Sequence, residues 1–424
     1  MRITALFAIL LTMFGLGFTS LARAEDGDES LRAQALSLNN ITGDAAITGK
    51  VRELAKDKTA LRKLLAEAVA MVKEKEKDKA SAFNYTGALV LARAAHVVRD
   101  TETSELFYKI CLEYASKLDS TEKLLQIYLG MIGLYSNAKK YDEEIFMCRK
   151  LLDLIKKEGE ESDMLETRLK VEDLIVQTLA RQKKYDKALE NVDELIRTNK
   201  EFSWFFVHSK ANIYRQMGKP DDAVVQLKKV QTIIDESDAI AGNKKEAVVE
   251  QFSKYPLSSA YIDAGQVDKS IEVLEELQKA HPEDPTYSND LGYVLADNDR
   301  RLDDAEKLVR KAIDLDREQR KKQKGEEAES DEEDHDNAAY LDSLAWVLYK
   351  KKAYEGARDI MLDVVKQEEA QHVEIYDHLG DIYMALGKKD EAVKTWKKGL
   401  TFDNVTPRDD ARKESVKKKI EAAK

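Results

Sequence analysis

Apolar and small residues recur at steps of three and four along most of this chain, which is the spacing of one face of an α-helix. The periodic runs are short and come in pairs, and turns that contain Gly265 or Gly387 separate the two members of a pair. Proline, which interrupts helices, occurs only five times in 424 residues. The pattern therefore predicts an all-α protein built from short helix pairs.

The helix pairs repeat along the chain. A small residue marks the second helix of each copy, at a position where a larger side chain would push the paired helices apart. These anchors are Ala188, Ala223, Ser270, Ala305, Ala357 and Ala392. Their successive spacings are 35, 47, 35, 52 and 35 residues. A 35-residue repeat with two insertions explains this series.

One copy carries a nearly complete motif. It consists of Tyr376, Leu379, Gly380, Tyr383, Ala392 and Trp396. This copy resembles the tetratricopeptide repeat (TPR), whose pattern is W-x2-L-G-x2-Y followed by A-x3-F. Other copies depart from the pattern, since Ser270 replaces the alanine and Leu295 and Leu348 replace the tyrosine. The resemblance implies a right-handed α-solenoid of stacked antiparallel helix pairs, a TPR superhelix, with capping helices at both ends.

The first 24 residues differ from the rest. They contain Arg2, a long apolar run, and small residues at Ala22 and Ala24, which is typical of a secretory signal peptide cleaved before Glu25. An uncleaved membrane anchor is the alternative, but the run falls short of the roughly 20 apolar residues that a spanning helix needs. We therefore expect an exported protein, periplasmic or secreted, without stable membrane insertion after cleavage.

Changes in composition and periodicity divide the chain into eight predicted segments. The predicted segments are a signal peptide (1–24), a disordered lead-in (25–44), an N-terminal helical cap (45–80), degenerate TPR-like helix pairs (81–200), TPR repeats (201–316), a charged and mostly disordered insertion (317–336), further TPR repeats (337–406) and a C-terminal helix (407–424). The last helix has few apolar residues, so it is interpreted as solvated.

Charge excludes some classes of partner. The formal net charge of −11 becomes −13 when the signal peptide and its two arginines are removed. An acidic surface repels phosphate backbones and anionic lipids, so nucleic acid and membrane surfaces are not expected partners. The acidic run over 326–336 lacks the ligand spacing of a helix–loop–helix calcium site, and it is interpreted as part of a solvated insertion.

No motif with a catalytic mechanism is present. The six histidines are scattered and none belongs to H-E-x-x-H, and neither G-x-S-x-G nor a phosphate-binding loop occurs. Cys111 and Cys148 fall at equivalent helical places in neighbouring repeats, where the helix separation exceeds the reach of a disulfide. We therefore predict a non-enzyme without cofactor or metal site, in which both thiols are free.

The resemblance to TPR arrays also implies a binding groove. In such arrays the first helix of each pair lines the concave side, which contacts peptides or helices of a partner. The corresponding residues are Phe205, His208, Asn212, Arg215, Phe252, Tyr255, Tyr293, Trp346, Tyr349, Asp381 and Met384. Packing of Trp346 and Tyr349 against a neighbouring repeat or the acidic insertion is an equally good interpretation.

These observations favour an exported, non-catalytic scaffold that binds a protein or peptide partner in its groove. Two alternatives stay open. An enzyme site could lie in the less regular N-terminal third, or the chain could self-associate into a structural array. The sequence does not identify the partner.

Overall fold

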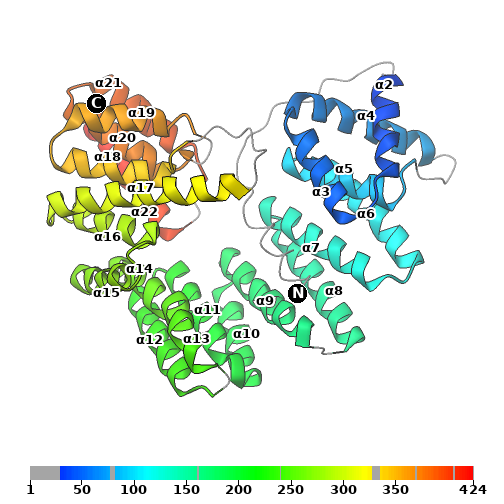
Figure 1. Cartoon of the computed structure of the whole chain (residues 1–424), viewed down its shortest axis with the longest axis horizontal. Helices are drawn as coiled ribbons and strands as arrows, with labels where there is room; N and C mark the ends of the chain where they lie inside the picture. The colour runs from blue at the N-terminus through cyan, green and yellow to red at the C-terminus, as the bar shows by residue number, and fades with distance from the viewer. Residues whose placement is uncertain are drawn as a thin grey trace. The chain divides into compact units, whose positions relative to one another are not determined.

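The computed structural model describes residues 29–76, 82–159, 162–238, 240–326, 335–367, 370–403 and 406–423. These residues form helices and turns, and no strand occurs among them. The chain divides into two compact units, Met1–Gln182 and Lys183–Lys424 (Figure 1). The predicted signal peptide lies outside the described residues.

The first unit is a series of antiparallel helices. Its helices are α2 (Glu29–Ser37), the 3₁₀ helix η1 (Leu38–Asn40), α3 (Asp44–Ala55), α4 (Lys58–Glu76), α5 (Tyr85–Val97), α6 (Thr101–Lys117), α7 (Thr121–Asn137), α8 (Tyr141–Glu158) and α9 (Ser162–Arg181). Helices α5 with α6, and α7 with α8, form the pairs of this unit. Both thiols are buried and free in it, and burial raises the pKa of Cys111 and of Cys148 to about 12.

The predicted disordered lead-in over 25–44 is wrong for its described part, because that part is helical and packed. Leu38 is fully buried, and Arg32 Nε lies 2.6 Å from Glu67 Oε1 of α4. The few apolar residues of this stretch gave no helical period, but the surface offered by α4 and α5 supplies the core that the segment lacks by itself.

The second unit carries the regular repeats. Its helices are α10 (Tyr185–Thr198), η2 (Lys200–Phe202), α11 (Ser203–Gln216), α12 (Pro220–Glu236), α13 (Gly242–Val249), the π-helical turn η3 (Glu250–Lys254), α14 (Tyr255–Asp263), α15 (Val267–Ala280), α16 (Pro285–Asp297), α17 (Leu302–Glu326), α18 (Ala338–Lys350), α19 (Tyr354–Val364), α20 (Val373–Ala385), α21 (Lys389–Gly399) and α22 (Pro407–Ala422). Five pairs follow one another, and their first helices are α11, α14, α16, α18 and α20.

The six anchor residues confirm the repeat period. Each of them is fully buried, including Ser270, whose hydroxyl finds no hydrogen-bond partner among the described residues. The turn inside a pair requires a left-handed residue after the first helix, and Gly387 adopts a φ of 75° there. Lys352 adopts a φ of 64° at the corresponding turn of the preceding pair, so not every copy uses glycine.

Both insertions contain helix. The 47-residue spacing adds α13, which leads through η3 into α14. In the charged insertion, α17 continues to Glu326, so the prediction of disorder from residue 317 is wrong for its first half. Its basic residues find partners, since Arg317 and Arg320 both contact Asp336. Most of the acidic run lies outside the described residues.

The C-terminal helix is packed and not simply solvated, which corrects the interpretation from sequence. Val416 and Ile420 of α22 are buried in a cluster with Ala392 and Trp396 of α21. The helix begins with a capping box between Thr406 and Asp409. Its apolar face is narrow, which is why composition alone indicated a solvated helix.

Candidate interaction face

The residues predicted for the groove come from the first helices of the second unit. We name the surface that they share the first-helix face. All of them are half-buried except Trp346, which is buried. They come from α11, η3, α14, α16, α18 and α20, which occupy successive places along the stack.

Hydrogen bonds join each first helix to the next along this face. His208 Nδ1 lies 2.8 Å from the carbonyl oxygen of Phe252, and the Tyr255 hydroxyl donates to Asp290 at 2.8 Å. The indole N–H of Trp346 donates to Asp297 at 3.0 Å. The sequence prediction therefore brought together residues that meet, but these side chains already have partners within the chain.

An aromatic cluster marks one end of the face, where Phe205 of α11 meets Phe252 of η3. Their ring centroids are 6.1 Å apart, and Trp204 packs edge-on against both rings. Arg215 lies on the same helix and pairs with Asp263 of α14 at 2.8 Å. Asn212 lies 3.2 Å from His208 Nε2 through its side-chain nitrogen. This end thus combines apolar and polar contacts between neighbouring repeats.

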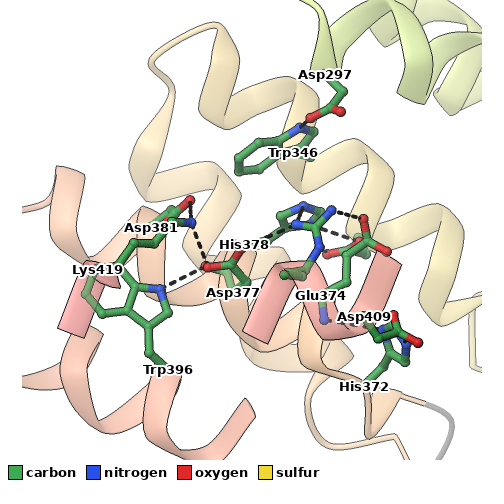
Figure 2. A network of polar contacts seen from close by, with 12 residues as sticks. Asp297, Trp346, His372, Glu374, Asp377, His378, Asp381, Trp396, Asp409 and Lys419 are labelled. Atoms are coloured by element: carbon green, nitrogen blue, oxygen red, sulfur yellow. Dashed lines mark hydrogen bonds and ion pairs between the residues drawn. The ribbon is translucent and has the colours of Figure 1, made fainter. Parts of the chain in front are cut away.

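Trp346 lies at the centre of an aromatic stack at the other end. Its ring is nearly parallel to those of Tyr349 and His378, with centroid distances of 4.8 and 4.0 Å. Figure 2 shows the indole between Asp297 and His378. Of the two interpretations that the sequence left open, packing against neighbouring repeats describes Trp346.

One member of this stack belongs to a buried pair that the sequence did not indicate. His378 of α20 is fully buried, and its Nδ1 lies 3.0 Å from Asp342 Oδ1 of α18. Glu374 lies one turn before His378 and accepts a hydrogen bond from the Tyr293 hydroxyl at 2.6 Å. An acid six residues before the motif glycine could have pointed to Glu374, but no pattern in the sequence connects His378 with Asp342.

Two basic residues of α22 complete the network. Arg412 lies 2.5 Å from Glu374 and 3.3 Å from Asp377. Lys419 lies 2.7 Å from both Asp377 and Asp381, and Figure 2 shows it reaching towards these two carboxylates. Neither residue was predictable from the sequence, because α22 carries too weak an apolar pattern to show which of its residues face inward.

The pKa values reflect these contacts. Burial alone would raise the pKa of Glu374, but Arg412, His378 and the Tyr293 hydroxyl lower it to about 2. Burial alone would lower the pKa of His378, but the Asp342 carboxylate raises it above 6.5. The hydrogen bond to Asp409 likewise raises the pKa of His372. These contacts therefore favour the charged forms of Glu374, His378 and His372.

The raised pKa of His372 predicts a pH-dependent contribution to stability. The protonated form is favoured in the folded state, so its contribution is present below pH 6.5 and is lost as the pH rises through the raised pKa. We expect His372→Asn, which keeps an acceptor for the helix cap, to lower the thermal midpoint more at pH 5.5 than at pH 9.

His208→Asn serves as the control for this prediction. Burial lowers the pKa of His208, so protonation opposes folding there and the dependence on pH has the opposite sign. Thermal unfolding of the full chain at both pH values measures the two differences. Equal losses at pH 5.5 and 9 for His372→Asn would contradict the assignment.

Neither a metal site nor a membrane-spanning helix occurs among the described residues. No group of three or more His, Cys, Asp or Glu side chains there is arranged to hold a metal ion. None of the described helices combines the length and the hydropathy that crossing a bilayer requires.

Comparison with known proteins identifies the repeat. Residues 255–319 and 373–405 each match a model of the tetratricopeptide repeat. A tetratricopeptide repeat protein from Parabacteroides merdae is similar at 12% identity, over 72% of this chain and 99% of that chain, with a TM-score of 0.47. MamA from Desulfovibrio magneticus RS-1 is similar at 20% identity, over 48% and 96%, with a TM-score of 0.33.

Yeast Tom70 is also similar, at 13% identity over 92% of this chain and 96% of that chain, with a TM-score of 0.31. The search of curated proteins gave no match. The two segments that match the family models contain the anchors Ser270, Ala305 and Ala392, which repeat-period analysis had identified from the sequence. The chain belongs to the tetratricopeptide repeat family, whose stacked helix pairs support a role as a protein-interaction scaffold.

Proposed function

We propose that the chain is an exported, non-catalytic adaptor that binds a protein segment along the first-helix face of its second unit. The observation that carries the proposal is the row of side-chain contacts from α11 to α20, which aligns aromatic, amide and charged groups on one face. Half-buried aromatics supply apolar area to an interface, and the polar groups between them supply hydrogen bonds.

The contacts within the chain decide which residues a test should change. Tyr293 and Trp346 each donate a hydrogen bond to a carboxylate in another repeat, so alanine at either position would disturb folding as well as binding. Arg215 and Tyr349 are better positions. Arg215 also pairs with a carboxylate of the next repeat, Asp263, but 33% and 23% of the two side chains are exposed, so loss of this pair costs little stability. Tyr349 contributes a half-buried ring at the edge of the stack.

The test compares a face variant, Arg215→Ala/Tyr349→Ala, with a matched control, Val225→Ala/Lys229→Ala, on the exposed side of α12. Each variant removes one cation and one apolar group. Tagged full-length chains are expressed in the native cells, cross-linked in the exported fraction, and analysed by quantitative mass spectrometry. We expect proteins captured by wild type and control to fall at least about fivefold with the face variant, the effect of losing about 1 kcal/mol of contact energy.

The same samples test export. The intact mass of the purified wild type should correspond to a chain that begins at Glu25. A full-length mass in the cell interior would contradict export and leave binding open, whereas equal capture by all three folded chains would contradict the proposed face. Circular dichroism of each variant provides the folding control.

A further inference from the structure

Helix α22 is a basic helix with a narrow apolar side, and it covers part of the first-helix face. It contains six Lys or Arg and four Asp or Glu residues. Arg412, Val416, Lys419 and Ile420 follow the helical spacing, so that they lie on one side, and all four contact α20 or α21. Lys417 and Lys418 are exposed.

Three carboxylates of α20 lie under this helix. Glu374, Asp377 and Asp381 are spaced by three and four residues, so they form one line along α20, which we name the carboxylate row. Among the described contacts, Asp377 and Asp381 receive their cations only from α22, and Asp377 is almost fully buried by them. Burial and the neighbouring Asp377 raise the pKa of Asp381. The row therefore depends on a basic partner.

The surface next to the carboxylate row is also acidic, and it includes aromatic rings. Asp297 from α16 adds one further carboxylate, which accepts a hydrogen bond from the indole of Trp346 (Figure 2). Acidic groups beside aromatic rings complement a helix that presents Lys or Arg among apolar residues, because the rings can contact the side-chain stems while the carboxylates pair with the charges.

The interactions that hold α22 combine a small apolar cluster with several ion pairs. Val416, Ile420 and Ala423 are the apolar residues buried at this end of the chain, whereas Arg412 and Lys419 between them contact all three carboxylates. Elements with few apolar contacts open with the smallest free energies. Partly exposed ion pairs also weaken as the salt concentration rises. These features suit a contact that another helix can replace.

We propose that the carboxylate row is a docking site for a basic amphipathic helix of a partner protein, and that α22 occupies the row until such a helix displaces it. The proposal rests on the proposed function, since it specifies the partner chemistry for one end of the first-helix face. The partner helix would present a cation, an apolar residue and a second cation at the spacing of Arg412, Val416 and Lys419.

The test uses full-length chains and a fluorescein-labelled peptide with the sequence of residues 406–424 as the probe. Arg412→Glu/Lys419→Glu reverses the two inward charges and opens the row. Lys417→Glu/Lys418→Glu is the matched control, because it makes the same change in charge on the exposed side of the same helix. Fluorescence anisotropy measures the affinity of each chain for the peptide at low salt.

We expect the opened variant to bind the peptide at least about tenfold more tightly than wild type or control, because α22 leaves the row free in only a small fraction of their molecules. Adding 0.5 M NaCl should reduce the binding, and Asp377→Asn/Asp381→Asn in the opened background should abolish it. If the opened variant loses helicity, Lys419→Ala, which keeps the Arg412–Glu374 pair, should still show a smaller gain.

Equal affinity for all three folded chains would overturn the proposal, as would tight binding that ignores the loss of Asp377 and Asp381. The alternative occupant of the row is α22 of a second copy of this chain, and analytical sedimentation tests for it. A wild-type dimer that the opened variant does not form would mean that α22 exchanges between copies, which would also overturn a site for a different protein. The peptide test could fail while a partner is still captured in a way that depends on Arg215 and Tyr349. That result would overturn the docking site and leave the proposed function intact.

Discussion

Replacing His378 by phenylalanine is expected to lower the free energy of unfolding of the second unit by about 3 kcal/mol. Phenylalanine preserves a ring against Trp346, whose centroid lies 4.0 Å from that of His378. It removes the N–H group that contacts the Asp342 carboxylate at 3.0 Å. Asp342 is 6% exposed, so it would be left without its partner and nearly without water.

The double variant Asp342→Leu/His378→Phe is the control, because it removes both polar groups. We expect it to recover at least half of the loss, since an apolar pair leaves no uncompensated group in the core. Urea unfolding followed by tryptophan fluorescence measures this unit selectively, because all three tryptophans lie in it. A double variant less stable than the single one would show that Asp342 does not depend on His378.

Replacing Gly380 by alanine is expected to cost the second unit about 1–3 kcal/mol. A Cβ atom at this position would lie 2.2 Å from Nε1 and 2.3 Å from Cδ1 of Trp396. The indole is 2% exposed and donates to the Asp377 carbonyl at 3.3 Å, so it has no free space in which to move. The helix pair α20 and α21 would have to separate.

Gly356→Ala in α19 is the matched control. A Cβ atom there meets only Leu348 Cδ1 at 3.7 Å, which is an ordinary contact. Alanine favours a helix interior over glycine, so this variant should gain about 0.5–1 kcal/mol. The same urea measurement compares the two variants. A Gly380→Ala protein as stable as Gly356→Ala would show that close approach of Trp396 is not what requires glycine.

The repeats were predictable because their determinants are local. Ala392 and Gly380 are small because the two helices of one pair cross there. The same close crossing recurs in every copy, within about 35 residues. The turn at Gly387 similarly depends on one residue with positive φ. Such features recur with a fixed period, which makes them visible in a single sequence without homologues.

The candidate site was only partly predictable. The motif register identified Tyr293, Trp346 and Asp381 as residues of the first helices. It could not show that Tyr293 donates to Glu374, or that Lys419 pairs with Asp381, because these partners are 81 and 38 residues apart in sequence. Hydrogen bonds between groups so distant in sequence produce no periodic pattern. In the sequence alone, a buried and paired acid next to a motif looks the same as an exposed acid.

The sequence by itself determined the all-helical repeat, its anchors and the family, because the spacing of small and apolar residues specifies how each helix packs on its neighbours. Only the tertiary structure decided which charges are buried and what α22 and the segment before α3 contact. Those two end segments have narrow apolar faces, so their structure depends on surfaces that other parts of the chain provide.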